Sequence, residues 1–136
     1  MIPFRVAFGP GIPIYDQVVY AAKKAIVSGQ LPAGAAFPSV RALSKELKIN
    51  PNTAHKVVAE LTSQRLLDVL PGIGTVVAKR SPFTVAQRRR LLGSEVERLV
   101  VEAKKIGLEL NDVVSAVSEH WKALQDAELA KEVEGK

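Results

Sequence analysis

The chain has 136 residues, 47% of them apolar and 24% charged, with a formal net charge of +5, a balance that favours a globular protein over a disordered one. It has no cysteine and only two histidines, which excludes disulfides, thiol catalysis and cysteine-ligated zinc. Because it has no run of ~18 apolar residues and no basic-then-apolar leader, we expect a cytoplasmic protein that is neither secreted nor inserted in a membrane.

An N-terminal arm and one helix are predicted first. Residues 3–8 alternate weakly between apolar and polar side chains, and Gly9-Pro10-Gly11 breaks the pattern, which indicates a short strand or arm. Apolar residues then recur at spacings of three and four from Ile14 to Ile26, and Gly29 supplies a stop. This periodicity predicts a helix over residues 15–28.

Two further helices with a short turn between them follow. Ser39 is suited to cap the first of them, whose buried side contains Leu43 and Leu47. Asn50 and Pro51 start the second, because asparagine caps helices and proline is tolerated at the first helical position. A helix of about eight residues, a turn of about three and another helix is the spacing of a helix-turn-helix.

The third predicted helix has one apolar and one polar side. At 100° per residue, the polar side includes Asn52 and Lys56, with His55 on its flank. The residues expected on the buried side are Ala54, Val58, Leu61 and Arg65. A polar side is ordinary for a surface helix, but its place directly after a helix and a short turn is what a recognition helix requires.

A β-hairpin is predicted after the third helix. Residues 67–70 and 75–78 are short apolar runs joined by Pro71-Gly72-Ile73-Gly74. Any tight hairpin favours glycine at positive φ, so Gly72 and Gly74 fit a purely structural role as well as close approach to another molecule. The hairpin would be the wing of a winged helix-turn-helix.

A domain boundary is expected at residues 79–82, which gives domains of residues 1–80 and 81–136. Two apolar stripes in the second domain predict two long helices separated by Gly107, with Gly93 bending the first.

Two helices cover only part of each other's stripe, so the remaining apolar surface needs a partner. It either folds onto the N-terminal core or meets a second copy across a two-fold axis. We favour the copy, in a small helical bundle. Trp121 is assigned to its core rather than to a ligand pocket. The predicted dimer interface is Leu92, Val96, Leu99, Val100, Ala103, Val113, Val117, Trp121 and Leu124.

The positive charge belongs to one half of the chain. Residues 1–80 hold ten Lys and Arg against four Asp and Glu, whereas residues 81–136 hold nine against ten. This asymmetry favours a polyanion partner for the N-terminal domain. Arg88-Arg89-Arg90 lies in the other half, and we interpret it as a solvated helix start rather than a second nucleic-acid patch.

Several linked motifs in the first half resemble the N-terminal domain of GntR-family bacterial transcription regulators. They are Pro13-Ile14-Tyr15-x-Gln17, Gly29-Gln30-Leu31-Pro32-Ala33-Gly34, Pro38-Ser39-Val40-Arg41-x-Leu43, Asn50-Pro51-Asn52-Thr53 and Gly72-Ile73-Gly74-Thr75-x-Val77. The short second half, with a turn at Ile106-Gly107-Leu108, looks like the YtrA-type subgroup.

This resemblance implies a double-stranded DNA partner and a small dimerisation module, and it also implies control of membrane-transporter genes. In that family the residue matching Arg41 and the start of the recognition helix touch DNA, and the glycine turn of the wing enters a minor groove. The DNA-binding residues assigned on this basis are Ser39, Arg41, Asn50, Pro51, Asn52, Thr53, His55, Lys56, Gly72, Gly74 and Thr75.

Some of these residues have competing roles. Asn50 is favoured as a helix cap, whereas Asn52 and Thr53 are the better candidates for base contacts, with capping as the alternative for Thr53. His55 is interpreted as an exposed recognition-helix residue, because it lacks cysteine or carboxylate partners for a metal. Lys56 is expected to supply charge independently of sequence.

The sequence therefore predicts a mainly α protein with a small β-hairpin wing: a winged helix-turn-helix domain followed by a two-helix dimerisation hairpin. We expect a homodimeric transcription repressor on a palindromic operator; the alternative is a winged-helix module that binds protein instead of DNA. No nucleophile–base pair, metal cluster or P-loop is evident, so neither an enzyme nor a cofactor is expected. A small-molecule effector is left open.

Overall fold

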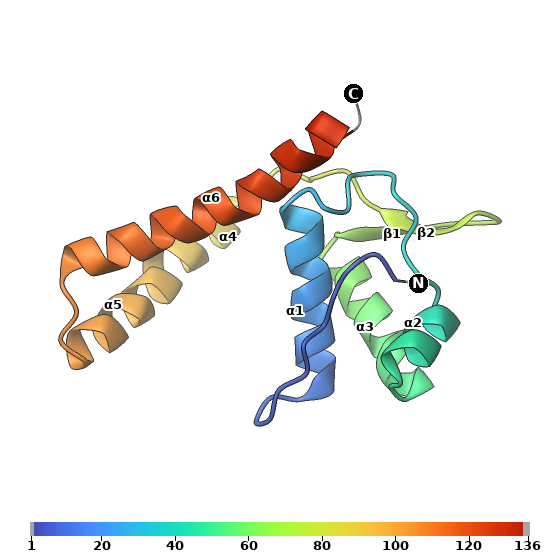
Figure 1. Ribbon diagram of the computed structural model, residues 1–136, viewed down its shortest axis with the longest axis horizontal. Coiled ribbons are helices and arrows are strands. Elements are labelled where there is room, and N and C mark those ends of the chain that lie inside the picture. The colour runs from blue at the N-terminus through green and yellow to red at the C-terminus, as the bar shows by residue number, and fades with distance from the viewer. Residues whose placement is uncertain (1, 135–136) are drawn as a thin grey trace. The chain divides into compact units, whose positions relative to one another are not determined.

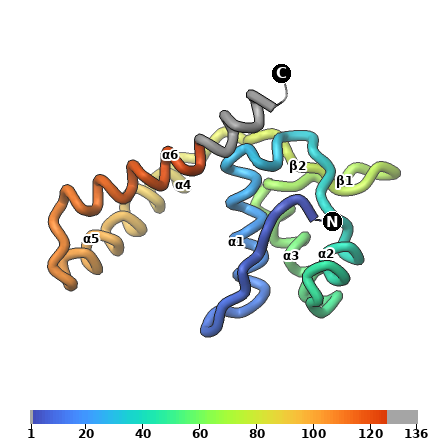
Figure 2. The backbone as a smooth tube through the Cα atoms, in the orientation of Figure 1, coloured from blue at the N-terminus to red at the C-terminus, as the bar shows by residue number. Residues whose placement is uncertain are grey.

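The computed structural model describes the backbone of residues 2–134 and the side chains of residues 2–125. Figure 2 traces the course of the backbone. The chain divides into two compact units, Met1–Arg80 with Leu124–Lys136 and Ser81–Ala123.

The Met1–Arg80 part of the first unit contains three helices and one hairpin (Figure 1). They are α1 (Ile14–Val27), α2 (Val40–Leu47), α3 (Pro51–Ser63), β1 (Leu67–Leu70) and β2 (Gly74–Val77). The strands pair antiparallel, from Leu67 opposite Val77 to Leu70 opposite Gly74. The predicted mainly α fold with a hairpin wing is confirmed.

α1 and β2 each begin and end one residue earlier than the predicted ranges of 15–28 and 75–78. α1 begins at Ile14 because Pro13 occupies its N-cap, where the missing backbone N–H of proline costs nothing. β2 begins at Gly74 because that residue pairs with Leu70.

The end of α3 differs more. The helix stops at Ser63, and Arg65 takes a left-handed φ of 61° and is exposed, so it does not extend the buried side of the helix. A left-handed residue ends an α-helix, and sequence periodicity does not reveal it.

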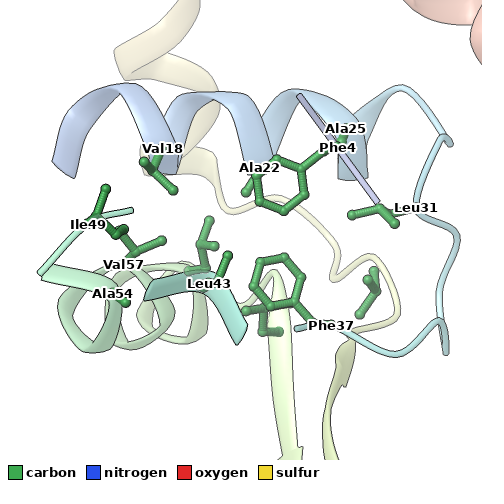
Figure 3. Packing of buried hydrophobic residues seen from close by; sticks show 13 residues of the cluster. Phe4, Val18, Ala22, Ala25, Leu31, Phe37, Leu43, Ile49, Ala54 and Val57 are labelled. Atoms are coloured by element: carbon green, nitrogen blue, oxygen red, sulfur yellow. The ribbon is translucent and has the colours of Figure 1, made fainter. Parts of the chain in front are cut away.

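The core of the first unit lies among α1, α2, α3 and the base of the hairpin. Phe4 and Phe37 stack there with ring centroids 5.8 Å apart (Figure 3). The buried residues of this core are Phe4, Val18, Ala22, Ala25, Leu31, Phe37, Leu43, Ile49, Ala54, Val57, Leu61, Leu67 and Val77. Phe4 belongs to the N-terminal arm that precedes α1, and because its side chain is buried in this core, the arm is part of the core.

The arm is also held by hydrogen bonds. The Gln17 side-chain amide accepts from Gly9 N at 2.8 Å and donates to the carbonyl oxygens of Gly9 and Ile12 at 3.0 and 2.7 Å. Gln30 Nε2 donates to Pro3 O at 3.1 Å. Residues 2–13 form an ordered arm without strand structure, although the sequence suggested either an arm or a strand.

The second unit is helical. It contains α4 (Val85–Arg89), a π-helical segment (Arg90–Glu95), α5 (Val96–Lys105) and the first part of α6 (Leu110–Glu134). Thr84 and Gln87 form a reciprocal capping box at the start of α4. Gly93, expected to bend this helix, lies in the π-helical segment, where the turn is wider than in an α-helix.

Within the described residues of this second unit, large apolar side chains are mostly exposed. Those exposed include Leu92, Val96, Leu99, Val117 and Trp121, whereas Ala103 is buried. Within residues 2–134, none of the helices combines the length and the apolar composition that a bilayer crossing requires.

Candidate nucleic-acid interface

The helix-turn-helix is built by two capped helices. Ser39 Oγ accepts a hydrogen bond from Ala42 N at 3.1 Å at the start of α2, and Asn50 Oδ1 accepts from Asn52 N at 2.7 Å at the start of α3. Each bond satisfies a backbone donor that the first helical turn leaves free. The two predicted caps are therefore present.

The turn between α2 and α3 has three residues, 48–50. Lys48 ends α2 in the left-handed conformation, with φ 55° and ψ 47°. Ser44 Oγ donates to Ile49 O at 2.7 Å, and the Ile49 side chain is buried. These contacts fix the angle at which α3 leaves α2.

The start of α3 presents its polar side chains to solvent. Asn52, His55 and Lys56 are exposed and Thr53 is partly buried, while Ala54 is buried against the core. Donors and acceptors of this kind in the first turn are what base-edge contact in a major groove requires. Among the described residues, His55 does not belong to any group of three or more potential metal ligands, and no other such group occurs.

α2 carries a row of cations that sequence analysis identified only in part. Arg41, Lys45 and Lys48 are exposed at spacings of four and three. The spacing places Arg41 and Lys45 on one face of α2, and Lys48 continues the row into the turn. Lys45 and Lys48 were missed, although the i, i+4, i+7 spacing was available in the sequence. Such a row fits contacts with a phosphate backbone.

The wing is a hairpin whose base is fixed to the segment before α2. Gly34 N donates to Val77 O, Val77 N to Ala35 O and Phe37 N to Thr75 O, each at 2.8 Å. Residues 34–37 thus extend the hairpin on the β2 side and set its position relative to α2. This pairing gave no clear signal in the sequence, because the segment is short and surrounded by Pro and Gly.

The tip of the wing extends away from the three helices (Figure 1). Gly72 and Gly74 have φ of 77° and 121°, so the tight turn uses both glycines at angles that other residues rarely adopt. Both are exposed, and Thr75 beside them is partly buried. Exposed backbone at the tip leaves room for close approach by another molecule.

Tyr15 on α1 is a partly buried titratable group in this unit. Burial raises the pKa of its hydroxyl above the ordinary value, and the carboxylates of Glu60 and Asp16 raise the pKa further. The hydroxyl therefore stays protonated at neutral pH. Tyr15 adds no negative charge to a unit whose exposed charges are mainly basic.

Residues 14–77 match the family model described as "Bacterial regulatory proteins, gntR family". The chain is 28% identical to the HTH-type transcriptional repressor YtrA of Bacillus subtilis (strain 168) over an alignment of 108 residues. This alignment covers 79% of this chain and 83% of that relative. These matches confirm the resemblance to GntR regulators and to the YtrA-type subgroup.

Solved structures share the fold. A GntR family transcriptional regulator from Listeria monocytogenes has 26% sequence identity and a TM-score of 0.63, with 82% of this chain and 98% of that one covered. A transcriptional antiterminator from Listeria monocytogenes EGD-e has a TM-score of 0.78 at 22% identity, with 90% and 92% covered. The second likeness concerns the fold alone.

Proposed function

We propose that this chain, which belongs to the GntR family of bacterial regulatory proteins through residues 14–77, is a sequence-specific DNA-binding transcription regulator. The observation that carries the proposal is the capped start of α3, which exposes Asn52, His55 and Lys56 directly after a helix bearing exposed Arg41. Polar side chains in that position fit base edges, and the neighbouring cations fit phosphates.

Each element would have its own contact with DNA. The first turn of α3 enters a major groove, α2 crosses the phosphate backbone with Arg41, Lys45 and Lys48, and the wing tip reaches an adjacent minor groove. Asn50 and Ser39 already use a side-chain oxygen as a cap. Their part in DNA binding is therefore mainly to fix the two helices.

A homodimer is supported by the exposed apolar stripes of the second unit. On α6 the exposed side chains Leu110, Val114, Val117 and Trp121 recur at spacings of four, three and four. This is the spacing by which helices pack in coiled coils and bundles.

The dimer would be formed by this stripe together with Leu92, Val96, Leu99 and Val100, which are also exposed. Ala103 is buried and Val113 and Leu124 are partly buried within one copy, so these three residues offer less surface to a partner. A two-fold dimer would bind two half-sites about one helical turn, ~34–36 Å, apart.

Repression is the favoured direction of regulation, because the similar YtrA protein is described as a transcriptional repressor. A dimer seated on an operator would block transcription by occupying promoter DNA in the cytoplasm. Control of transporter genes is carried over from the subgroup resemblance and belongs to the same proposal.

A mobility-shift titration against palindromic promoter DNA at about 50 mM and about 200 mM salt tests the proposal. A protein that contacts six to ten phosphates loses about 10³- to 10⁵-fold in affinity over this range. The alternative, a winged-helix module that binds only protein, gives no shift. Absence of a complex at the lower salt concentration, with any promoter fragment, would reject DNA binding.

A further inference from the structure

The wing ends in a single apolar side chain. Ile73 is 77% exposed, the most exposed large apolar residue among those that the structure describes. Its backbone N–H donates to Leu70 O at 3.0 Å, which closes the turn. Ile73 is therefore held at the outer end of an ordered hairpin although it buries little apolar surface in its own chain.

The tip is narrow on both sides of Ile73. Gly72 and Gly74 flank it, and a Cβ built on either glycine would meet nothing within 4 Å. The turn thus has open space beside it where side chains would otherwise project. The Ile73 side chain is therefore flanked on each side by a glycine, which has no side chain.

This shape suits a minor groove, which is about 6 Å wide. The pairing of β2 with residues 34–37 also fixes the position of the hairpin relative to the start of α2. When the helix-turn-helix binds DNA, the position of the wing tip is therefore fixed relative to the duplex. An exposed isoleucine is by itself unremarkable on a protein surface. Its position at a narrow, anchored tip of a DNA-binding unit gives it a specific use.

The chemistry of the groove decides what an aliphatic group can distinguish. In the minor groove A·T and T·A pairs present only acceptors, whereas G·C adds the amino group on N2 of guanine. Isoleucine has no donor or acceptor, so it cannot hydrogen-bond to either. The isoleucine side chain packs against the floor of the minor groove at A·T pairs. At G·C pairs the guanine amino group projects into the groove and obstructs the side chain, and the amino group loses its bound water without gaining a hydrogen bond in return.

We propose that Ile73 is a specificity-determining residue that contacts the minor-groove floor and disfavours G·C pairs beneath the wing. The proposal rests on the proposed function, because it requires the helix-turn-helix to bind DNA. Since Ile73 carries no charge, its discrimination is independent of salt, unlike the phosphate contacts of α2.

Inosine·cytosine pairs isolate this effect. Inosine keeps the major-groove groups of guanine and lacks only the N2 amino group. Each A·T pair of an operator selected with the wild-type protein is replaced in turn by I·C and by G·C. Binding is then measured for the wild type, Ile73→Ala and Val69→Ala, the last being a control for another exposed apolar residue of the hairpin.

At one or more positions in each half-site, the wild type should bind the G·C operator about tenfold more weakly than the I·C operator. Ile73→Ala should reduce that ratio to about twofold or less, while Val69→Ala keeps it. Equal binding of I·C and G·C operators by the wild type at every position would overturn the inference, as would an unchanged ratio in Ile73→Ala. A wild type that binds no DNA contradicts the proposed function instead, so the two failures are distinguishable.

Discussion

At the scale of single residues, Arg41 is the most direct probe of DNA contact. It is exposed on α2 and forms no hydrogen bond or ion pair with the described part of the chain. Its removal should therefore leave the fold nearly unchanged. A loss of DNA binding in its variants is then a loss of contact with DNA.

Arg41→Ala should weaken specific operator binding by about 1–3 kcal/mol, because the guanidinium offers paired donors to a guanine or a phosphate. Fluorescence-anisotropy titration with a labelled operator measures this change. Arg98→Ala removes the same charge from the exposed surface of α5 and serves as the matched control. Equal affinities for Arg41→Ala and the wild type would contradict the assigned contact.

Lys56→Gln should lower affinity similarly for all DNA sequences and reduce the slope of log affinity against log salt by about one unit. The physical reason is the loss of one released counterion. Titrations at several salt concentrations give the slope, and Lys104→Gln, on the exposed surface of α5, should leave it unchanged. If both variants keep the wild-type slope, Lys56 does not contact a phosphate.

At the scale of elements, the sequence was most informative where structure is local. Ser39 and Asn50 were predicted as caps because capping depends on a side chain and the two or three residues after it. The hairpin was predicted for the same reason, since its turn residues adjoin its strands. The geometry of the helix-turn-helix and the wing follows largely from these local signals.

Long-range contacts were not predictable from the pattern. Phe4 stacks on Phe37, which is distant in the sequence. Residues 34–37 pair with β2 although α2 and α3 lie between the two segments in the sequence. Neither contact leaves a periodic trace in the sequence. Consequently the sequence predicted an arm or a short strand before the first helix, but it did not predict that Phe4 of this arm belongs to the core.

Phe4→Ala should lower the free energy of unfolding by about 3–5 kcal/mol, because it empties a buried aromatic site. Phe8 lies in the same arm but is 45% exposed, against 4% for Phe4, so Phe8→Ala should cost far less. Urea denaturation at one fixed protein concentration compares the two variants. Similar losses for both would show that the arm does not pack as described.

At the scale of the whole molecule, the proposed dimer would bury the exposed apolar stripe of α6, which includes Val114, Val117 and Trp121. Val117→Glu places a carboxylate in that stripe and should convert a dimer to a monomer, since burial of an unpaired charge is costly. Sedimentation equilibrium at micromolar concentration gives the mass. Ile12→Glu, which alters an exposed apolar residue of the N-terminal arm, should remain dimeric.

A monomeric wild-type protein at this concentration would remove the basis for the dimer. So would a Val117→Glu variant that keeps the wild-type mass. The first result would leave the helix-turn-helix intact as a DNA-binding unit but would predict a single half-site in place of a palindrome.

Selection of bound fragments from a random DNA library with the purified chain, followed by sequencing, tests the central claim of sequence-specific DNA binding most directly. A dimer that reads DNA with two α3 helices should enrich one inverted repeat whose half-sites lie about 10–10.5 base pairs apart, centre to centre, or a multiple of that spacing. Retained fragments that share no motif, or an Arg41→Ala variant that enriches the same repeat equally well, would contradict this claim.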